Sequence, residues 1–149
     1  MTYGLIFIFA TGLALVAWIR FAPDDPARWH VPVADAGAPH PGPCADQIRI
    51  VPQGARATCL LADPPATVLA RLDTLALSTP RTTRLAGTPQ DGRLTWVSRS
   101  RLMGYPDYIT AEASQTPQGT RLDIFSRQRY GSGDWGVNAA RLRAWLSQP

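Results

Sequence analysis

The stretch from Arg93 to Tyr130, RLTWVSRSRLMGYPDYITAEASQTPQGTRLDIFSRQRY, carries the strongest fold signal in the chain. Its β-branched and aromatic side chains fall into three runs that favour strands, at 93–103, 108–114 and 121–130. Residues 104–107 and 116–119 separate these runs and have the glycine and proline content of tight turns. Because tight turns connect neighbouring antiparallel strands, the stretch predicts an antiparallel meander.

Further elements are expected on both sides of the meander. Asp63 and Pro64 suit a helix N-cap and first helical position, and the apolar residues that follow recur at helical spacing. The expected elements are a strand at 47–51, a helix at 64–77, a strand at 82–86 and a final helix at 135–147. The order β-α-β-β-β-β-α predicts an α+β two-layer sandwich, with an antiparallel sheet and two helices on one face. This order resembles the helix-grip or TBP-like architecture.

The chain begins with an apolar segment. Gly4 to Ile19 contains no charged residue and spans about 24 Å as a helix, with Arg20 placed to reach lipid head groups. Tyr3 and Trp18 lie near its ends, where aromatic residues prefer the membrane interface. A cleaved signal peptide is the alternative, but no basic residue precedes the run and no small-x-small cleavage site follows. We therefore expect residues 1–21 to form an uncleaved transmembrane anchor.

Residues 22–45 are rich in proline and contain both histidines, His30 and His40. Such a stretch is typical of an extended, semi-rigid linker that forms no core. We expect it to space a folded domain, residues 46–149, from the bilayer.

The side of the membrane on which this domain lies is predicted from two opposing signals. Arg20 and Arg28 follow the apolar run and no basic residue precedes it, so a positive-inside count places the domain in the cytoplasm. Cys44 and Cys59 could instead form a disulfide, which requires an oxidising compartment; two unrelated thiols are the alternative. We expect a single-pass protein of the cell inner membrane with a periplasmic domain.

The net charge is +4, and every basic side chain is arginine. Strand alternation places Arg99 and Arg101 on one face of their strand, and Arg127 and Arg129 on one face of theirs. If the opposite, apolar-and-serine faces point toward the helices, the four arginines form a cationic patch that could bind phosphate or carboxylate. The alternative is a solvated face balanced by acidic residues. The charge alone gives no reason to expect nucleic-acid binding beside a membrane.

Two segments carry a family resemblance: 93–110, RLTWVSRSRLMGYPDYIT, and 126–146, SRQRYGSGDWGVNAARLRAWL. They resemble the signature of DUF1499, a family of unknown function, including the run that contains Asp134, Asn138 and Arg141. Similar chains commonly begin with a hydrophobic anchor followed by a stretch like APDDPARWH, here residues 22–30. The resemblance implies no activity. From the residues themselves, Asp134 is expected to cap the last helix.

The sequence contains few of the residue patterns that catalysis or cofactor binding requires. Residues 46–149 contain no histidine, so no Ser-His-Asp or Cys-His arrangement can form within them. The cysteine pair has no further metal-ligand motif, and no phosphate-binding loop is present. We expect no catalytic residues, metal or cofactor. A hydrolase that uses acidic residues such as Asp107 and Asp134 is the alternative, and it would require a cleft with acids of raised pKa.

These observations predict a non-catalytic, membrane-anchored domain that binds an anionic or lipid-like ligand or a partner protein. The alternative is an accessory subunit of a larger membrane protein complex. A closed pocket lined by Trp96, Tyr108 and Phe125 would favour the ligand, whereas a flat, exposed arginine patch would favour the partner.

Overall fold

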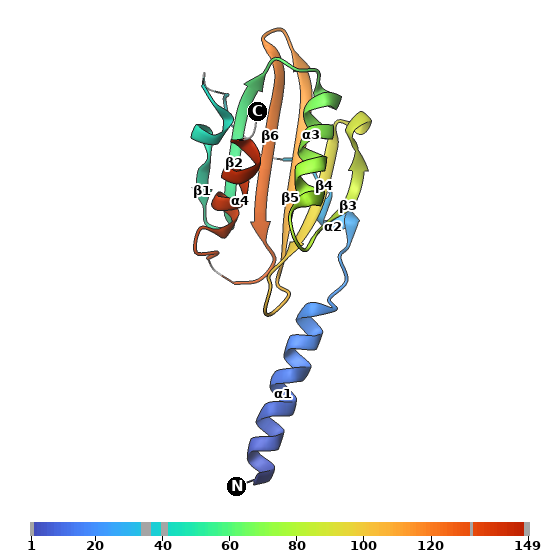
Figure 1. The fold of residues 1–149 in the computed structure, drawn as a ribbon, viewed down its shortest axis with the longest axis vertical. Helices are drawn as coiled ribbons and strands as arrows, with labels where there is room; N and C mark the ends of the chain where they lie inside the picture. The colour runs from blue at the N-terminus through green and yellow to red at the C-terminus, as the bar shows by residue number, and fades with distance from the viewer. Residues whose placement is uncertain (1, 34–36, 40–41, 132, 148–149) are drawn as a thin grey trace.

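The structure, a computed structural model, describes residues 2–33, 37–39, 42–131 and 133–147. It is an α+β fold with a six-stranded antiparallel sheet and an N-terminal helix that projects from one end of the domain (Figure 1). The helices are α1 (Thr2–Arg20), α2 (Pro26–Trp29), α3 (Pro65–Ser78) and α4 (Val137–Leu146). The strands are β1 (Arg49–Val51), β2 (Gly54–Leu61), β3 (Thr82–Thr88), β4 (Arg93–Arg99), β5 (Pro106–Thr116) and β6 (Gly119–Gln128).

The sheet has the strand order β1-β2-β6-β5-β4-β3. Strands β3 to β6 form the predicted antiparallel meander, and β2 adds to its β6 edge. Strand β2 was missed by the predicted order of five strands. Its residues Ala55, Ala57 and Cys59 are completely or almost completely buried, and small side chains there let α4 pack closely on the sheet. Small residues give a weak strand signal, which explains the omission.

Helices α3 and α4 cover one face of the sheet, as predicted (Figure 1). The core between them and the sheet contains Leu69, Ile124 and Leu142, and Trp96 meets Trp145 edge-on at 5.6 Å between ring centroids. Helix α3 begins at Pro65 and has no side-chain cap, so the predicted capping by Asp63 was wrong. The Asp63 carboxylate instead pairs with Arg71 of the same helix.

The other face of the sheet is covered by the segment that follows α1, which we call the strap (residues 22–33). Trp29 of the strap is only 8% exposed and stacks on Tyr108 of β5, with ring centroids 3.9 Å apart. The expectation of a spacer that forms no core is therefore wrong for these residues. Proline is tolerated at the start of a helix, as at Pro26 of α2, and it leaves carbonyl oxygens and intervening side chains able to pack on a sheet.

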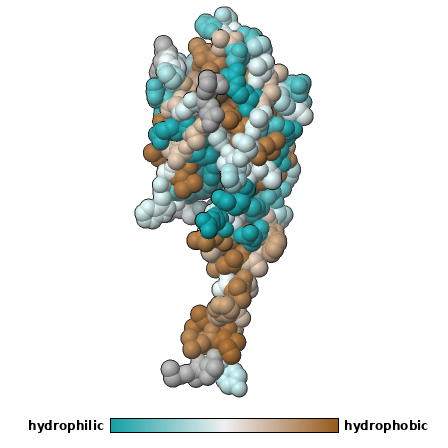
Figure 2. All heavy atoms as spheres, viewed as in Figure 1, coloured by the Kyte–Doolittle hydropathy of each residue, from teal (hydrophilic) through white to brown (hydrophobic). Residues whose placement is uncertain are grey.

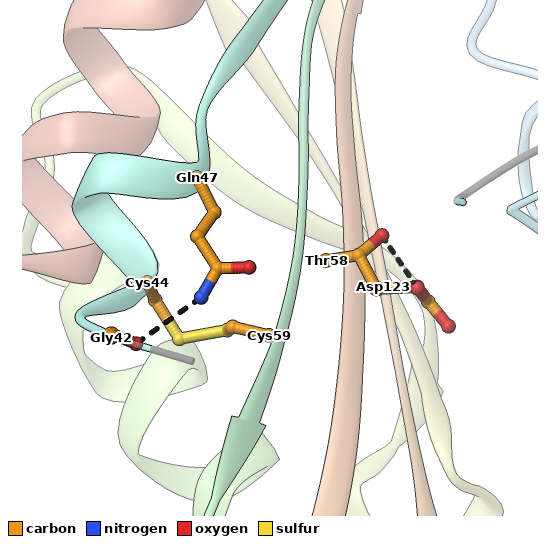
Figure 3. Close-up of a disulfide and its surroundings, with 6 residues drawn as sticks. All are labelled: Gly42, Cys44, Gln47, Thr58, Cys59 and Asp123. Atoms are coloured by element: carbon orange, nitrogen blue, oxygen red, sulfur yellow. Dashed lines mark hydrogen bonds between the residues drawn. A yellow bond between two sulfur atoms is a disulfide. The ribbon is translucent and has the colours of Figure 1, made fainter. Parts of the chain in front are cut away.

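A disulfide joins Cys44 to Cys59, with 5.3 Å between the Cα atoms (Figure 3). Cys44 begins the 3₁₀ turn η1 (Cys44–Gln47), and Cys59 points from β2 into the helix-covered core. Its neighbour Thr58 points to the opposite face and donates to Asp123 at 2.8 Å. The bridge therefore ties the chain that follows the strap to the helix-covered side of the sheet.

Helix α1 has the length and apolar composition to cross a membrane, a property that N-terminal signal sequences share. Its surface is mostly hydrophobic, and hydrophilic side chains gather where it meets the domain (Figure 2). We call this end of the domain the basal end. The β4–β5 turn and the loop between β6 and α4 lie at the same end (Figure 1).

Candidate functional site

Three of the four arginines in the predicted patch contact the strap or the end of α1. Arg99 Nη1 donates to the carbonyl oxygen of Arg20 at 3.2 Å, and Arg99 Nη2 forms an ion pair with Asp24 at 2.7 Å. The Arg20 carbonyl is at the C-terminus of α1, where helix carbonyls lack intrahelical partners and a positive charge is favourable. Arg99 therefore fixes the direction in which α1 leaves the domain.

Arg127 near the end of β6 and Arg129 just after it also hold the strap. Arg127 Nη2 donates to the Trp29 carbonyl oxygen at 2.6 Å, and its guanidinium lies 5.3 Å from the Trp29 ring centroid. Burial, with a smaller contribution from Arg56, lowers the pKa of Arg127. Arg129 Nη1 donates to the Pro23 carbonyl oxygen at 2.9 Å. Backbone oxygens of the chain itself thus occupy the positions expected for an external anion.

The centre of the strap contact is polar and closely fitted. The completely buried Tyr108 donates from its hydroxyl to Asp24 at 2.6 Å; burial and this hydrogen bond raise the pKa of Tyr108 to about 12. His30 Nδ1 lies 2.9 Å from the Thr95 hydroxyl oxygen. A Cβ atom at Gly87, where φ is +86°, would lie 2.9 Å from His30 Cε1, so this approach requires glycine.

The structure separates the remaining predicted residues. Strand β4 ends at Arg99, so Arg101 lies in the β4–β5 turn and its side chain is exposed at the basal end. Trp96 belongs to the helix-covered core, whereas Tyr108 and Phe125 face the strap. These three aromatic residues therefore do not line one pocket, which is the arrangement that would have favoured a small ligand there.

A different concave site lies at the basal end between α3, α4 and the end of β4. We call it the basal hollow; its volume is about 490 Å³. Its polar lining includes Ser78, Thr79, Arg81, Ser98, Arg99, Ser100, Arg101 and Arg141. Four arginines therefore line this opening, but Arg99 directs its guanidinium to the strap and the end of α1, and Arg141 directs its own to Asp107.

Two of these arginines have uncommitted donors. Arg81 donates from Nε to the Arg99 carbonyl oxygen at 3.2 Å, and its guanidinium forms no ion pair with the described residues. Its φ of +61° is in the left-handed region, which is uncommon for a residue with a side chain. Arg101 likewise has no carboxylate partner in the described part of the chain. Sequence reasoning missed Arg81, because it follows a helix-ending Ser-Thr-Pro and lies on no regular element.

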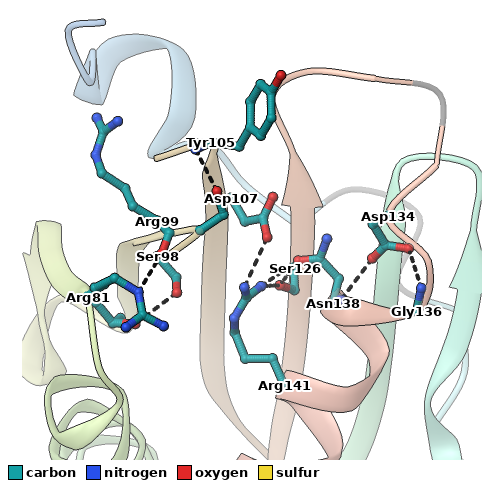
Figure 4. A network of polar contacts seen from close by, with 12 residues as sticks. Arg81, Ser98, Arg99, Tyr105, Asp107, Ser126, Asp134, Gly136, Asn138 and Arg141 are labelled. Carbon is teal, nitrogen blue, oxygen red and sulfur yellow. Dashed lines mark hydrogen bonds and ion pairs between the residues drawn. The ribbon is translucent and has the colours of Figure 1, made fainter. Parts of the chain in front are cut away.

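Arg141 belongs to a buried network that builds the wall of the hollow (Figure 4). It pairs with Asp107 at 2.9 Å and donates to the Asn138 side-chain oxygen at 2.7 Å and to the Ser126 hydroxyl at 3.1 Å. Burial raises the pKa of Asp107, and the neighbouring Arg141 opposes this shift. The predicted group of Asp134, Asn138 and Arg141 thus includes two members that bond directly and hold α4 to β5 and β6.

Asp134 accepts hydrogen bonds from the backbone N–H groups of Gly136 and Asn138, at 3.0 and 2.8 Å. Burial alone would raise the pKa of Asp134, but the hydrogen bonds, led by that from Asn138, lower it below its ordinary value. The N-cap of α4 is Gly136 and the helix has no side-chain cap, so the predicted capping by Asp134 was wrong; Asp134 lies two residues before the cap and binds the backbone N–H groups there instead. Asp107 and Asp134 share the lining of a second hollow of about 370 Å³, together with Tyr105 and Tyr130. Both oxygens of Asp134 and Oδ2 of Asp107 are engaged by these structural contacts.

A third concavity is an apolar groove of about 500 Å³ between α3 and α4, lined by residues that include Leu61, Leu72, Leu75 and Trp145. Among the described residues, no group of histidine, cysteine, aspartate and glutamate side chains could hold a metal ion.

Comparison with known proteins gives one match. Residues 34–148 match the family described as "Protein of unknown function (DUF1499)", which is most of the chain. The strap and α1 precede the matched range. No curated protein and no solved structure matches the chain.

Proposed function

We propose that this protein, which belongs to the DUF1499 family, is a non-catalytic domain that is held at a membrane by α1 and binds an anionic, lipid-like ligand in the basal hollow. The observation that carries the proposal is the position of Arg81 and Arg101. Both line a concave site beside the end of the membrane-length helix. Planar guanidinium groups with open donors bind phosphate or carboxylate in a bidentate manner.

The ligand site also differs from the arginine patch expected on the sheet. Arg127 and Arg129 of that patch already donate to strap carbonyl oxygens, so an external anion would have to displace the chain's own backbone. The basal hollow requires no such displacement. We therefore assign anion binding to Arg81 and Arg101, because Arg99 and Arg141 are already paired with Asp24 and Asp107.

Three further assignments complete the proposal. The arrangement is of the helix-grip type, since both helices pack on one face of the sheet and the hollows open between helices and sheet. Helix α1 is an uncleaved signal-anchor of the cell inner membrane, supported by its firm attachment to Arg99. The domain is periplasmic, supported by the Cys44–Cys59 disulfide, because such bridges persist in oxidising compartments.

The test is lipid retention by the full-length protein. Detergent-solubilised protein is supplemented with phosphatidylglycerol or with phosphatidylcholine, and bound lipids are counted by native mass spectrometry. We expect the Arg81→Gln/Arg101→Gln double variant to lose about thirtyfold in phosphatidylglycerol affinity, since each arginine near an anionic lipid contributes about 1 kcal/mol. Arg143→Gln is the matched control, because Arg143 is exposed on α4 and does not line the hollow.

Equal phosphatidylglycerol binding by the double variant and the Arg143→Gln control would reject the basal hollow as the ligand site. Stoichiometric recovery of another membrane protein, unaffected by either variant, would favour the alternative of an accessory subunit. A hydrolase is the third possibility, supported only by the raised pKa of Asp107 in its hollow. It predicts lipid turnover that disappears in Asp107→Asn.

A further inference from the structure

The basal end carries a concentration of exposed apolar side chains outside α1. Leu102 at the tip of the β4–β5 turn is 82% exposed, and Trp135 in the loop before α4 is fully exposed. Phe21, at the end of α1, and Tyr105 are also exposed. We call these four residues the basal rim. Water-exposed aromatic and leucine side chains grouped at one end of a domain mark a surface that has a partner.

The rim is fixed to the last turn of α1. Arg99 Nη1 donates to the carbonyl oxygens of both Arg20 and Gly104, so one guanidinium joins α1 to the β4–β5 turn. A Cβ atom at Gly104 would lie 3.0 Å from Arg20 Cγ, which shows how closely the turn approaches the helix. Tyr130 links the two sides, because its ring centroid lies 6.1 Å from that of Trp18 and 6.0 Å from that of Tyr105.

This attachment sets the depth of the rim. Arg20 and Trp18 end the apolar run of α1, and arginine and tryptophan at the end of a spanning helix lie at the level of the lipid head groups. Gly104 contacts Arg20 of this turn directly, and Tyr105 is linked to Trp18 through Tyr130. The β4–β5 turn therefore lies at the level of the head groups too. Arg101, exposed beside Leu102, adds a positive charge suited to an anionic surface.

Trp135 supplies an independent observation. Its φ is +54°, and it shares the left-handed region with only one other non-glycine residue of the described chain, Arg81. A bulky residue in this conformation is a strained exception, and such exceptions gather at functional sites. The two residues both lie at the basal end, one on the rim and one in the basal hollow.

We infer that the basal rim inserts into the head-group layer of the bilayer that α1 spans, so that lipid contacts the domain at Leu102 and Trp135 as well as along α1. This inference rests on the proposed membrane anchoring, but not on the ligand of the basal hollow. Its consequence is that the domain has a fixed orientation, with the basal hollow opening beside the head groups instead of toward bulk solvent.

The test uses full-length protein in phosphatidylcholine–phosphatidylglycerol nanodiscs that contain either unlabelled lipid or lipid brominated near the head-group end of its acyl chains. The difference in fluorescence between wild-type and Trp135→Phe protein isolates the emission of Trp135. We expect brominated lipid to quench this difference signal at least twofold, and aqueous acrylamide to quench it little. Gln118→Trp in the Trp135→Phe background is the matched control, since Gln118 is exposed in the β5–β6 turn at the opposite end.

The inference is overturned if Trp135 responds to acrylamide and brominated lipid as the Gln118→Trp control does. The difference between wild-type and Trp18→Phe protein tests the premise separately. If the Trp18 signal is lipid-quenched and the Trp135 signal is not, the anchor stands and only the inserted rim is rejected. If neither is lipid-quenched, the membrane anchoring fails and the inference fails with it.

Discussion

The two faces of the sheet are covered by different physical means. The helix-covered face is closed by apolar side chains of α3 and α4, which meet a core that includes Trp96, Leu122 and Ile124. The strap-covered face is closed mainly by hydrogen bonds, from arginine side chains of β4 and β6, and from Arg129 just after β6, to backbone oxygens of residues 20–29. Among the described residues, its apolar contacts include the stack of Trp29 on Tyr108 and the packing of Val33 against Phe125.

This difference indicates that the two faces have different roles in the domain. Apolar burial is the dominant stabilising term in folding, so the helix-covered face is expected to determine whether the domain folds. Net hydrogen-bond contributions are smaller, because both partners are hydrated when separated. The strap-covered face is therefore expected to determine how the domain is attached to α1, and to open locally before the rest unfolds.

The largest expected effect is on the helix-covered face. Trp96→Ala removes a completely buried ring and leaves the buried Asp73 carboxylate without the indole donor that lies 2.8 Å from it. We expect a loss of about 3–5 kcal/mol in the free energy of unfolding, from the cavity and from the lost hydrogen bond. Urea denaturation of the full-length protein in detergent measures it. A loss no larger than that of Trp29→Ala would contradict the division between the faces.

The second largest effect is expected on the strap-covered face. Trp29→Ala removes the strap's main apolar contact, and we expect a loss of about 2 kcal/mol, the usual contribution of one buried large side chain. The loss should appear as faster hydrogen exchange in residues 22–33 while the amides of α3 and α4 stay protected. Trp29→Phe is the control, because it retains a ring that can stack on Tyr108. Equal deprotection of strap and helices in Trp29→Ala would show that the strap is part of the cooperative core.

The helix-covered face could be predicted from sequence because its signals are periodic. Alternation in β4 and β6 placed Trp96 and Ile124 toward the helices, and helical spacing located α3 to within a residue or two. Strand β2 was missed because Ala55 and Ala57 are small, although their size is what lets α4 approach. A run of small residues beside a predicted helix is the signal that could have located it.

The strap-covered face could not be predicted in the same way, because its contacts produce no periodic pattern of residues in the sequence. Backbone carbonyl oxygens accept most of its hydrogen bonds, and every residue has a carbonyl, so nothing in the sequence marks those of Pro23 and Trp29 as ligands for arginine. The predicted grouping of the four arginines assumed that the strand containing Arg99 and Arg101 continued to residue 103. The strand ends at Arg99, and Arg101 therefore joins the basal end instead. The tryptophan and histidine within the proline-rich stretch were the available signal, since a solvated spacer has no need of either.

The smallest expected effect is that of His30, which can be distinguished from the other contributions to stability by its dependence on pH. Burial, followed by the nearby Arg93, lowers the pKa of His30, against smaller opposing effects of Asp91 and Glu112. As pH falls, His30 of the unfolded chain is therefore protonated near the ordinary histidine pKa, whereas His30 of the folded protein stays neutral to lower pH. The stabilising contribution is complete above about pH 6.5 and is lost as pH falls toward the lowered pKa.

Asp107 titrates with the opposite sign, since its raised pKa makes the folded state bind more protons and adds stability as pH falls. The urea midpoint of the wild-type protein therefore reflects both His30 and Asp107 as pH changes. Subtracting the midpoint of His30→Asn protein at each pH leaves the contribution of His30 in the strap. We expect that difference to shrink as pH falls from about 7.5 to about 5, because only the wild-type protein loses its neutral His30–Thr95 contact. A constant difference across this range would mean that His30 is not held in its neutral form. The pH sensitivity would then belong to the helix-covered face alone.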